Sequence, residues 1–430
     1  MKYRLLSLFS LSVLILTSCV PVSTTSYNAG KKLLFDNVDY EDNVGMVQLF
    51  PFSQNLQSEL ENPVLEVGNE NGFLLQFDLF EENYSSLNVR YIHCNKDWTP
   101  SGLSDIRFLN EYNSFAINNY QYSSNTRKKY VQYAVQLPSP HISGNYLVVV
   151  SNSNSNDDII FSRRAMVYDR TANAQGDIQM SSSVKERKTN QQVAFSVNYS
   201  GLNNVNPLRD IYVVLLQNHN WDVALKELKP TLVRHDESYL EFHHFNSENN
   251  FPGANEFRYF DLRSIDFKGM NVANVKKEEG RVLAFLGTDK PRGSLAYSQL
   301  IQDLNGKYFL VNSDPGDSQL QSEYVDVYFE LKSDKIAGEV FVTGRFNNWT
   351  RTPENRMIYA PERNSYRGKV LLKQGYYDYM YWVESPSLKP GYFEGNYFQT
   401  TNDYEIMVYY RDPINNFDEL IGYKSIKSEF

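Results

Sequence analysis

Short stretches in which apolar and polar side chains alternate recur along most of this sequence. Residues 73–79, 193–199 and 325–331 each place apolar residues at every second position. Because successive side chains of a strand point to opposite faces, a period of two indicates strands with one buried face. Residues 210–216 form a more continuous apolar strand, and turn-rich breaks separate the segments. This pattern predicts an all-β chain built of sandwiches.

Length and composition agree with several such sandwiches. The chain holds 32 Tyr and 26 Phe, residues that suit pleated, half-buried surfaces. A mature chain of about four hundred residues is too long for one core. Polar breaks at residues 171–176 and 314–318 suggest where it divides. We therefore expect tandem immunoglobulin-like β-sandwich domains at residues 30–170, 171–317 and 318–430.

The first residues indicate export. Lys2 and Arg4 precede an apolar run, residues 5–16, that is too short to span a bilayer as a helix. The run ends in Leu-Thr-Ser-Cys at residues 16–19, which resembles a bacterial lipobox. We predict a lipoprotein signal peptide at residues 1–18, lipid attachment at Cys19 and a flexible tether at residues 19–29. The alternative is an ordinary secretory signal that happens to contain a cysteine.

The sequence offers no pattern of an enzyme or a metal site. The net charge of −9 is spread without a basic run, which argues against nucleic acid and anionic lipid headgroups as partners. The six histidines are scattered, and no nucleophile elbow, phosphate loop or calcium loop is present. Cys94 is expected to be buried and inert rather than a nucleophile. We predict a non-enzymatic protein with no cofactor, no metal and no small-molecule substrate.

One local pattern points to the type of the last sandwich. Residues 340–349 read VFVTGRFNNW, and residues 375–379 read GYYDY. This order resembles the early-set, glycogen-binding β-sandwich modules, in which the second strand packs beside the first. Met380 stands where that family usually has a lysine, and Ser-Pro-Ser at residues 385–387 stands where it has a tryptophan. Trp349 is therefore only a weak sugar-stacking candidate. The alternative is that Phe346 and Trp349 close the edge of the sandwich.

Several longer strings, taken in order, resemble one family. Residues 91–98 read YIHCNKDW, residues 253–261 read GANEFRYFD, and DKPR and DLNG follow at residues 289–292 and 303–306. This order is similar to the plug protein of the Bacteroidetes type IX secretion system, from about residue 44 to residue 383.

The resemblance implies a partner rather than a reaction. It implies a protein on the periplasmic side of the outer membrane that closes the outer-membrane secretion barrel when no substrate is engaged. Residues 20–25 carry no acidic side chain, which favours the periplasmic face. Two alternatives remain open. One is a carbohydrate-binding outer-membrane lipoprotein that uses the C-terminal sandwich, and the other is a periplasmic chaperone or scaffold.

The longer strings also have structural interpretations. Asn255, Glu256, Arg258 and Asp261 could contact the partner, but we favour a role in holding the domains together. We expect Arg258 to pair locally, with Glu256 or Asp261. Cys94 and Trp98 are expected to fill the first core.

Overall fold

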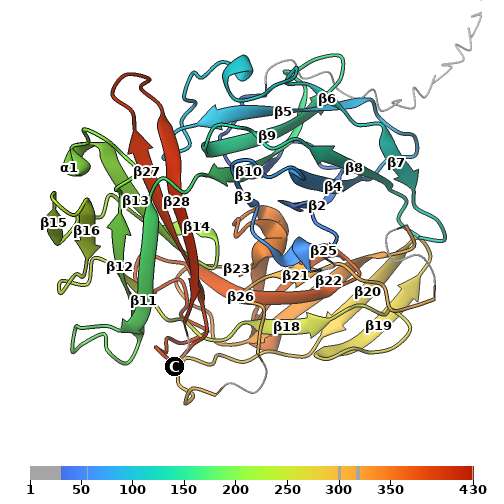
Figure 1. Ribbon diagram of the computed structural model, residues 1–430. Helices are drawn as coiled ribbons and strands as arrows, with labels where there is room; N and C mark the ends of the chain where they lie inside the picture. Colours follow the sequence, from blue (N-terminus) through green and yellow to red (C-terminus); the bar gives the residue numbers. More distant parts are fainter. Residues whose placement is uncertain (1–30, 56, 299–301, 316–319, 429) are drawn as a thin grey trace, which may run out of the picture.

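The computed structural model describes residues 31–55, 57–298, 302–315, 320–428 and 430. Its strands form five sheets, and the short elements between them are one α-helix, α1 (Pro207–Asp210), and five 3₁₀ turns within these residues. The predicted all-β fold of tandem sandwiches is confirmed (Figure 1). We call the three sandwich units the first unit (residues 31–170), the second unit (171–252 with 403–428) and the third unit (253–402).

The first unit packs two sheets face to face. One has the order β1-β10-β9-β5-β6 with β3 beside β10, and the other has the order β2-β4-β8-β7. The predicted alternation in residues 73–79 is that of β4, and Phe77 stacks on Tyr133 of β8 across the register. The elements are β1 (Val38–Asp39), β2 (Val44–Pro51), η1 (Ser58–Leu60), β3 (Val64–Glu66), β4 (Phe73–Leu79), β5 (Leu87–Cys94), η2 (Asp105–Arg107), β6 (Phe115–Ala116), β7 (Asn119–Tyr122), β8 (Val131–Leu137), β9 (Gly144–Asn152) and β10 (Ile159–Tyr168).

The second unit also consists of two sheets, with orders β11-β12-β16-β15 and β14-β13-β27-β28, and β17 pairs with β12. Its last two strands come from the C-terminal end of the chain, and β27 pairs with β13 over the whole length of β13. The elements are β11 (Asn173–Met180), β12 (Asn190–Asn198), β13 (Ile211–Gln217), β14 (Asn220–Lys226), β15 (Leu232–Arg234), β16 (Tyr239–Phe242), β17 (Asn250–Pro252), β27 (Asp403–Arg411) and β28 (Asp418–Lys427).

The third unit is one nine-stranded sheet, in the order β18-β26-β23-β24-β25-β22-β20-β19 with β21 beside β26. Strand β24 pairs with both β23 and β25, so the sheet wraps around its own core. The elements are β18 (Arg258–Asp261), β19 (Val272–Glu278), β20 (Arg281–Leu286), β21 (Tyr308–Phe309), β22 (Tyr324–Lys332), β23 (Glu339–Thr343), η3 (Arg345–Asn347), η4 (Pro353–Asn355), β24 (Arg356–Ala360), η5 (Pro361–Arg363), β25 (Ser365–Lys373) and β26 (Tyr376–Glu384).

The sheets do not divide at the predicted boundary between residues 317 and 318. Strands β18 to β21 already belong to the third unit, whereas β27 and β28 return to the second. The predicted break at residues 171–176 also runs into β11. That segment is polar because β11 is an outer strand that buries only alternate side chains. Residues 316–318 of the predicted second break lie outside the described residues.

The first and second units stack through the outer faces of their inner sheets. In β9, Tyr146 and Val148 face the core of the first unit, whereas Leu147 faces β13 and β27. Four sheet layers therefore lie one on another. We call this contact the apolar seam; it is formed by Cys94, Trp98, Leu147, Val149, Ile159, Met166, Val214, Leu216, Met407, Tyr409 and Leu420.

The sequence predicted that Cys94 and Trp98 fill the first core. Both instead lie in the apolar seam. Residue Cys94 sits at the end of β5 with its side chain on the face away from the first core. Its predicted burial is confirmed, because the side chain is fully buried, and burial raises the pKa of its thiol to about 12. A thiol with such a pKa is almost never ionised near neutral pH.

Candidate functional site at the junction of the units

Asn255, Glu256, Arg258 and Asp261, the residues singled out from the sequence, lie where the second unit meets the third. The Nδ2 of Asn255 donates to the carbonyl of Glu394 at 2.8 Å. The Glu256 carboxylate accepts from the Tyr297 hydroxyl at 2.6 Å and from a backbone N–H at 3.0 Å. Both side chains are thus occupied by the chain itself.

Arg258 forms a buried ion-pair network. Its Nε lies 3.0 Å from the Glu394 carboxylate, its Nη1 2.7 Å from Asp289, and its Nη2 donates to the Lys290 carbonyl at 2.8 Å. The expected local pairing is not observed, since Asp261 instead binds Arg263 at 2.6 Å. An offset of three along β18 turns Asp261 to the opposite face from Arg258. Loop residues from elsewhere in the chain, outside the named strands, therefore supply the partners of Arg258.

Glu394 is the centre of this network. It is 1 % exposed and receives Arg258 together with Arg292, whose Nη2 lies 2.6 Å away. Burial alone raises its pKa, but the two guanidinium groups lower the pKa of Glu394 to about 2. The carboxylate therefore stays ionised at every physiological pH, and its charge is fully compensated.

A second group of carboxyls in this region is poorly compensated. Asp303 accepts hydrogen bonds from the backbone N–H groups of Phe257 and Asn305, and Asp378 accepts from that of Leu304 at 2.6 Å. Burial raises the pKa of Asp303 to about 7, with the nearby Glu256 adding to the effect. Burial and the charge of Asp303 raise the pKa of Asp378 to about 8. These carboxyls titrate near neutral pH.

We use the name polar seam for the region where the second unit joins the third. It comprises the carboxylate and arginine groups above, which all belong to the third unit, and the amide side chains that bridge to the second unit. Amide side chains complete it: Gln191 donates to two carbonyls of the segment before β27, and Asn402 binds both Gln191 and Asn218. Its members are Gln191, Gln217, Asn218, Asn255, Glu256, Arg258, Asp289, Arg292, Asp303, Asp378, Glu394, Asn396 and Asn402.

A separate buried ion pair joins the first and third units. Lys373 lies 2.7 Å from Asp78, and the Tyr324 hydroxyl donates to the same carboxylate at 2.6 Å. Asp78 occupies the mixed face of β4 that the sequence alternation left without a role. Neither this pair nor Glu394 was singled out from the sequence. Their partners lie far along the chain, and no local pattern signals them.

Trp349, the sugar-stacking candidate, is 5 % exposed and packs beside Phe257, with ring centroids 5.7 Å apart. A Cβ at Gly306, whose φ is +80°, would lie 2.5 Å from the indole, so glycine permits this close packing. Phe346 lies in the core of the third unit, and β23 pairs with β26 as the resemblance to the early-set fold implied. The ring of Trp349 offers no open face on which a sugar could stack.

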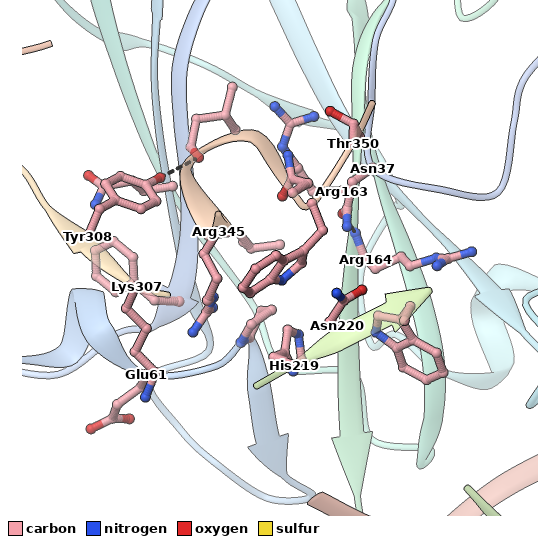
Figure 2. Close-up of a pocket in the computed structure, with 18 of the residues that line it drawn as sticks. Asn37, Glu61, Arg163, Arg164, His219, Asn220, Lys307, Tyr308, Arg345 and Thr350 are labelled. Carbon is pink, nitrogen blue, oxygen red and sulfur yellow. Dashed lines mark hydrogen bonds between the residues drawn. The ribbon is translucent and has the colours of Figure 1, made fainter. Parts of the chain in front are cut away.

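Trp349 is among the residues that line a cavity of about 120 Å³ where the three units meet; Figure 2 shows this cavity. The first unit contributes Arg163 and Arg164 to its wall, the second contributes His219, and the third contributes Arg345. The remaining lining residues are Asp36, Asn37, Val47, Gln48, Leu49, Phe50, Glu59, Leu60, Glu61, Pro63, Asn220, Trp221, Asp222, Lys307, Tyr308, Asn348 and Thr350.

The remaining sequence predictions concern the lipid anchor, membrane-spanning segments and metal ligands. Cys19 and the predicted tether lie outside the described residues. In the part of the chain that the structure describes, no helix has the length and apolar character needed to cross a membrane. No three His, Cys, Asp or Glu side chains among the described residues are grouped as metal ligands.

Comparison with known proteins places the first unit in a family. Residues 45–169 match the model of the type 9 secretion system plug protein 1st domain. No curated protein matches the sequence. A crystal structure of a hypothetical protein from Parabacteroides merdae ATCC 43184, at 2.30 Å resolution, is similar over 92 % of this chain and 100 % of that one, with 29 % identity and a TM-score of 0.86. Over residues 45–169 the resemblance seen in the sequence is confirmed, and this domain belongs to the plug protein family of the type 9 secretion system.

Proposed function

We propose that this protein is a non-enzymatic component of the type IX secretion system that plugs the periplasmic opening of the outer-membrane translocon barrel while the barrel is idle. The observation that carries the proposal is the family match of residues 45–169, which links the chain to type IX secretion. A plug must cover a wide aqueous opening without deforming.

The way the units are joined suits that task. The apolar seam, the polar seam and the Asp78–Lys373 pair connect each unit to both of the others. Such a body can act as one rigid cover. The carbohydrate-binding alternative has less support, because Trp349 has no open ring face. No observation separates a scaffold role from a plug except the family match itself.

Deletion of the gene tests the proposal. A barrel that exports whole proteins leaves an aqueous hole when idle. Loss of the plug should therefore increase uptake of a bulky antibiotic or dye, while cargo secretion continues. The matched control is a strain that also lacks the barrel, in which uptake should return to the wild-type level. Unchanged uptake in the single deletion, or raised uptake that persists without the barrel, would contradict the plug function.

The lipid anchor at Cys19 belongs to the same proposal. Tethering on the periplasmic face would raise the effective concentration of the protein at the barrel mouth. Metabolic labelling with a fatty-acid analogue should mark the wild-type protein and not Cys19→Ala. Equal labelling of both proteins would refute the anchor and leave the ordinary secretory signal as the explanation of residues 1–18.

A further inference from the structure

The cavity at the junction of the three units contains one cation that lacks a carboxylate partner among the described residues. Arg163 is paired with Asp39 at 2.6 Å, and Lys307 is paired with Asp403 at 3.1 Å. Arg345, in contrast, forms no ion pair with any described residue; its side chain donates to the neutral Asn62. The other two basic residues of the cavity wall are also paired: Arg164 with Asp36 at 3.0 Å and His219 with Glu405 at 2.8 Å.

Arg345 reaches the cavity from η3, and few of its N–H donors are used in hydrogen bonds to the described residues. Its Nη1 donates to Asn62 Oδ1 at 2.7 Å, a neutral acceptor. A guanidinium has five N–H donors, and a buried charge is costly unless it is paired. Burial lowers the pKa of Arg345. The closest carboxylates, Glu405 and Asp403, are already engaged by His219 and Lys307.

Two further donors in the cavity wall have no acceptor. The indole Nε1 atoms of Trp221 and Trp349 are buried and have no hydrogen-bond partner among the described residues, and both tryptophans line the cavity. An indole nitrogen can only donate. Trp349 is held there by a left-handed backbone, with φ of 61°, an uncommon conformation for a bulky residue. Residues that line one cavity thus supply a guanidinium whose acceptor is the neutral Asn62 and two indole N–H groups that have no acceptor in the described chain.

The chemistry that satisfies these donors is a small anion with oxygen acceptors. The cavity of about 120 Å³ limits its size to a few heavy atoms. Glu59 and Glu61 also line the wall, and their carboxylates disfavour a ligand with several negative charges. We propose that the cavity binds a small monocarboxylate, with Arg345 as its ion-pair partner and the indole N–H groups of Trp221 and Trp349 donating to its oxygens.

Binding at this position would have a structural consequence. Arg163 and Arg164 of the first unit, Trp221 of the second, and Arg345 and Trp349 of the third line the cavity, so a bound anion would lie among groups from all three units. A ligand that binds only the assembled state stabilises it by mass action. The inference is independent of the proposed function, since it concerns the junction of the units and not the barrel.

Titration of the purified mature protein with sodium acetate and sodium propionate tests the inference, at ionic strength held constant with sodium chloride. Tryptophan fluorescence should change saturably, because two of the four tryptophans line the cavity. The melting temperature should rise with carboxylate concentration. Acetamide, which has nearly the same shape but no charge, should produce neither effect.

Variants locate the site. Arg345→Met should weaken carboxylate binding at least ~10-fold, because the only charge partner is lost. Arg187→Met removes an exposed arginine far from the cavity lining and should bind like wild type. Equal binding by wild type and Arg345→Met, or an equal response to acetamide, would overturn the inference. Saturable binding of inorganic phosphate but not of acetate would overturn the assignment to a monocarboxylate.

Discussion

The two seams that join the second unit to its neighbours are built from opposite materials. In the apolar seam, Leu147 and Met166 of the first unit pack against Met407 and Leu420 of the second. In the polar seam, amide side chains such as Gln191 and Asn402 bridge the second and third units, beside an ion-pair network centred on Glu394 that lies within the third unit. Burial of apolar area is non-directional, whereas each buried polar atom needs its own partner.

Chain connectivity explains why an apolar contact is needed at one junction whereas a polar contact is enough at the other. The chain passes from the first unit to the second once, near residue 170, so that contact must be stable by itself. It crosses between the second and third units twice, near residues 252 and 402, because β27 and β28 return to pair with β13. Two covalent links keep those surfaces together at a high effective concentration. The polar seam can therefore set a precise orientation without a large apolar area.

The largest loss of stability is expected when the carboxylate at the centre of the polar seam is removed. Glu394→Ala leaves the buried Arg258 and the half-buried Arg292 without their shared carboxylate, so we expect a loss of about 3–5 kcal/mol in the free energy of unfolding. Urea denaturation measures it. The control is Glu339→Ala, which breaks a half-exposed pair with Arg356 and should cost less than about 1 kcal/mol. Similar losses in both variants would show that the network is not energetically central.

The apolar seam should respond to volume rather than to partners. Leu420 is fully buried between the units, and Leu420→Ala should cost about 2–4 kcal/mol through lost apolar contact and a residual cavity. Leu420→Met conserves volume and should cost less than about 1.5 kcal/mol. Glu394→Gln conserves shape equally well but removes a charge from two arginines. If both conservative changes cost the same, the distinction between the seams fails.

The apolar seam leaves a signal in the sequence and the polar seam does not. A strand with one buried face alternates, as β4 does, whereas β9 and β13 are buried on both faces and read as continuous apolar runs. The continuous run at residues 210–216 was visible from the sequence alone. What it could not reveal was the partner sheet, because β27 lies beyond the whole third unit.

The candidate site was recognised only in part, for a physical reason. The string at residues 253–261 correctly marked a structural region, but Arg258 pairs with Glu394, 136 residues away, and with Asp289, 31 residues away. Ion pairs of this kind depend on which distant segments the topology brings together, and local periodicity does not encode the topology. Arg345 lies in a turn that resembled a sugar-binding motif, and only the three-dimensional structure shows that it has no carboxylate partner among the described residues.

The pH dependence of stability should also differ between the two junctions. The pKa values of Asp303 and Asp378, about 7 and about 8, lie above the usual value of 3.8, so the folded state holds their protons longer than the unfolded state. Stability from these groups is therefore present at low pH and is lost as the pH rises toward 8. Between pH 6.5 and 8 the loss should be on the order of 2 kcal/mol. Asp378→Asn should flatten this part of the stability profile, measured by urea denaturation.

His93 gives the opposite slope at the other junction. Its ring lies edge-on to Phe417, 5.4 Å between centroids, and burial lowers its pKa to about 4. The unfolded state takes up this proton below about pH 6.5, so stability from His93 is lost as the pH falls from 6.5 toward 4. His93→Gln should remove that acid-side decline and leave the slope above pH 6.5 unchanged. The loss of stability from Asp303 and Asp378 overlaps this pH range, so the test is the difference between the wild-type and His93→Gln profiles. Parallel profiles between pH 4 and 6.5 would contradict the role of His93.

The smallest expected effect comes from Cys94, which lies in the apolar seam. Cys94→Ala removes one sulfur atom, which makes a weak polar contact to the Ile92 carbonyl at 3.5 Å. We expect it to cost less than about 1.5 kcal/mol, because small deletions leave small cavities.

In the wild type, burial and a pKa of about 12 should make the thiol unreactive toward a maleimide while the seam is closed. Labelling thus reports opening of the apolar seam. It should accelerate in Leu420→Ala at a urea concentration where both variants remain mostly folded, and Leu420→Met should label at nearly the wild-type rate. Acceleration in Glu394→Gln as large as in Leu420→Ala would mean that the two seams open together, as one cooperative unit.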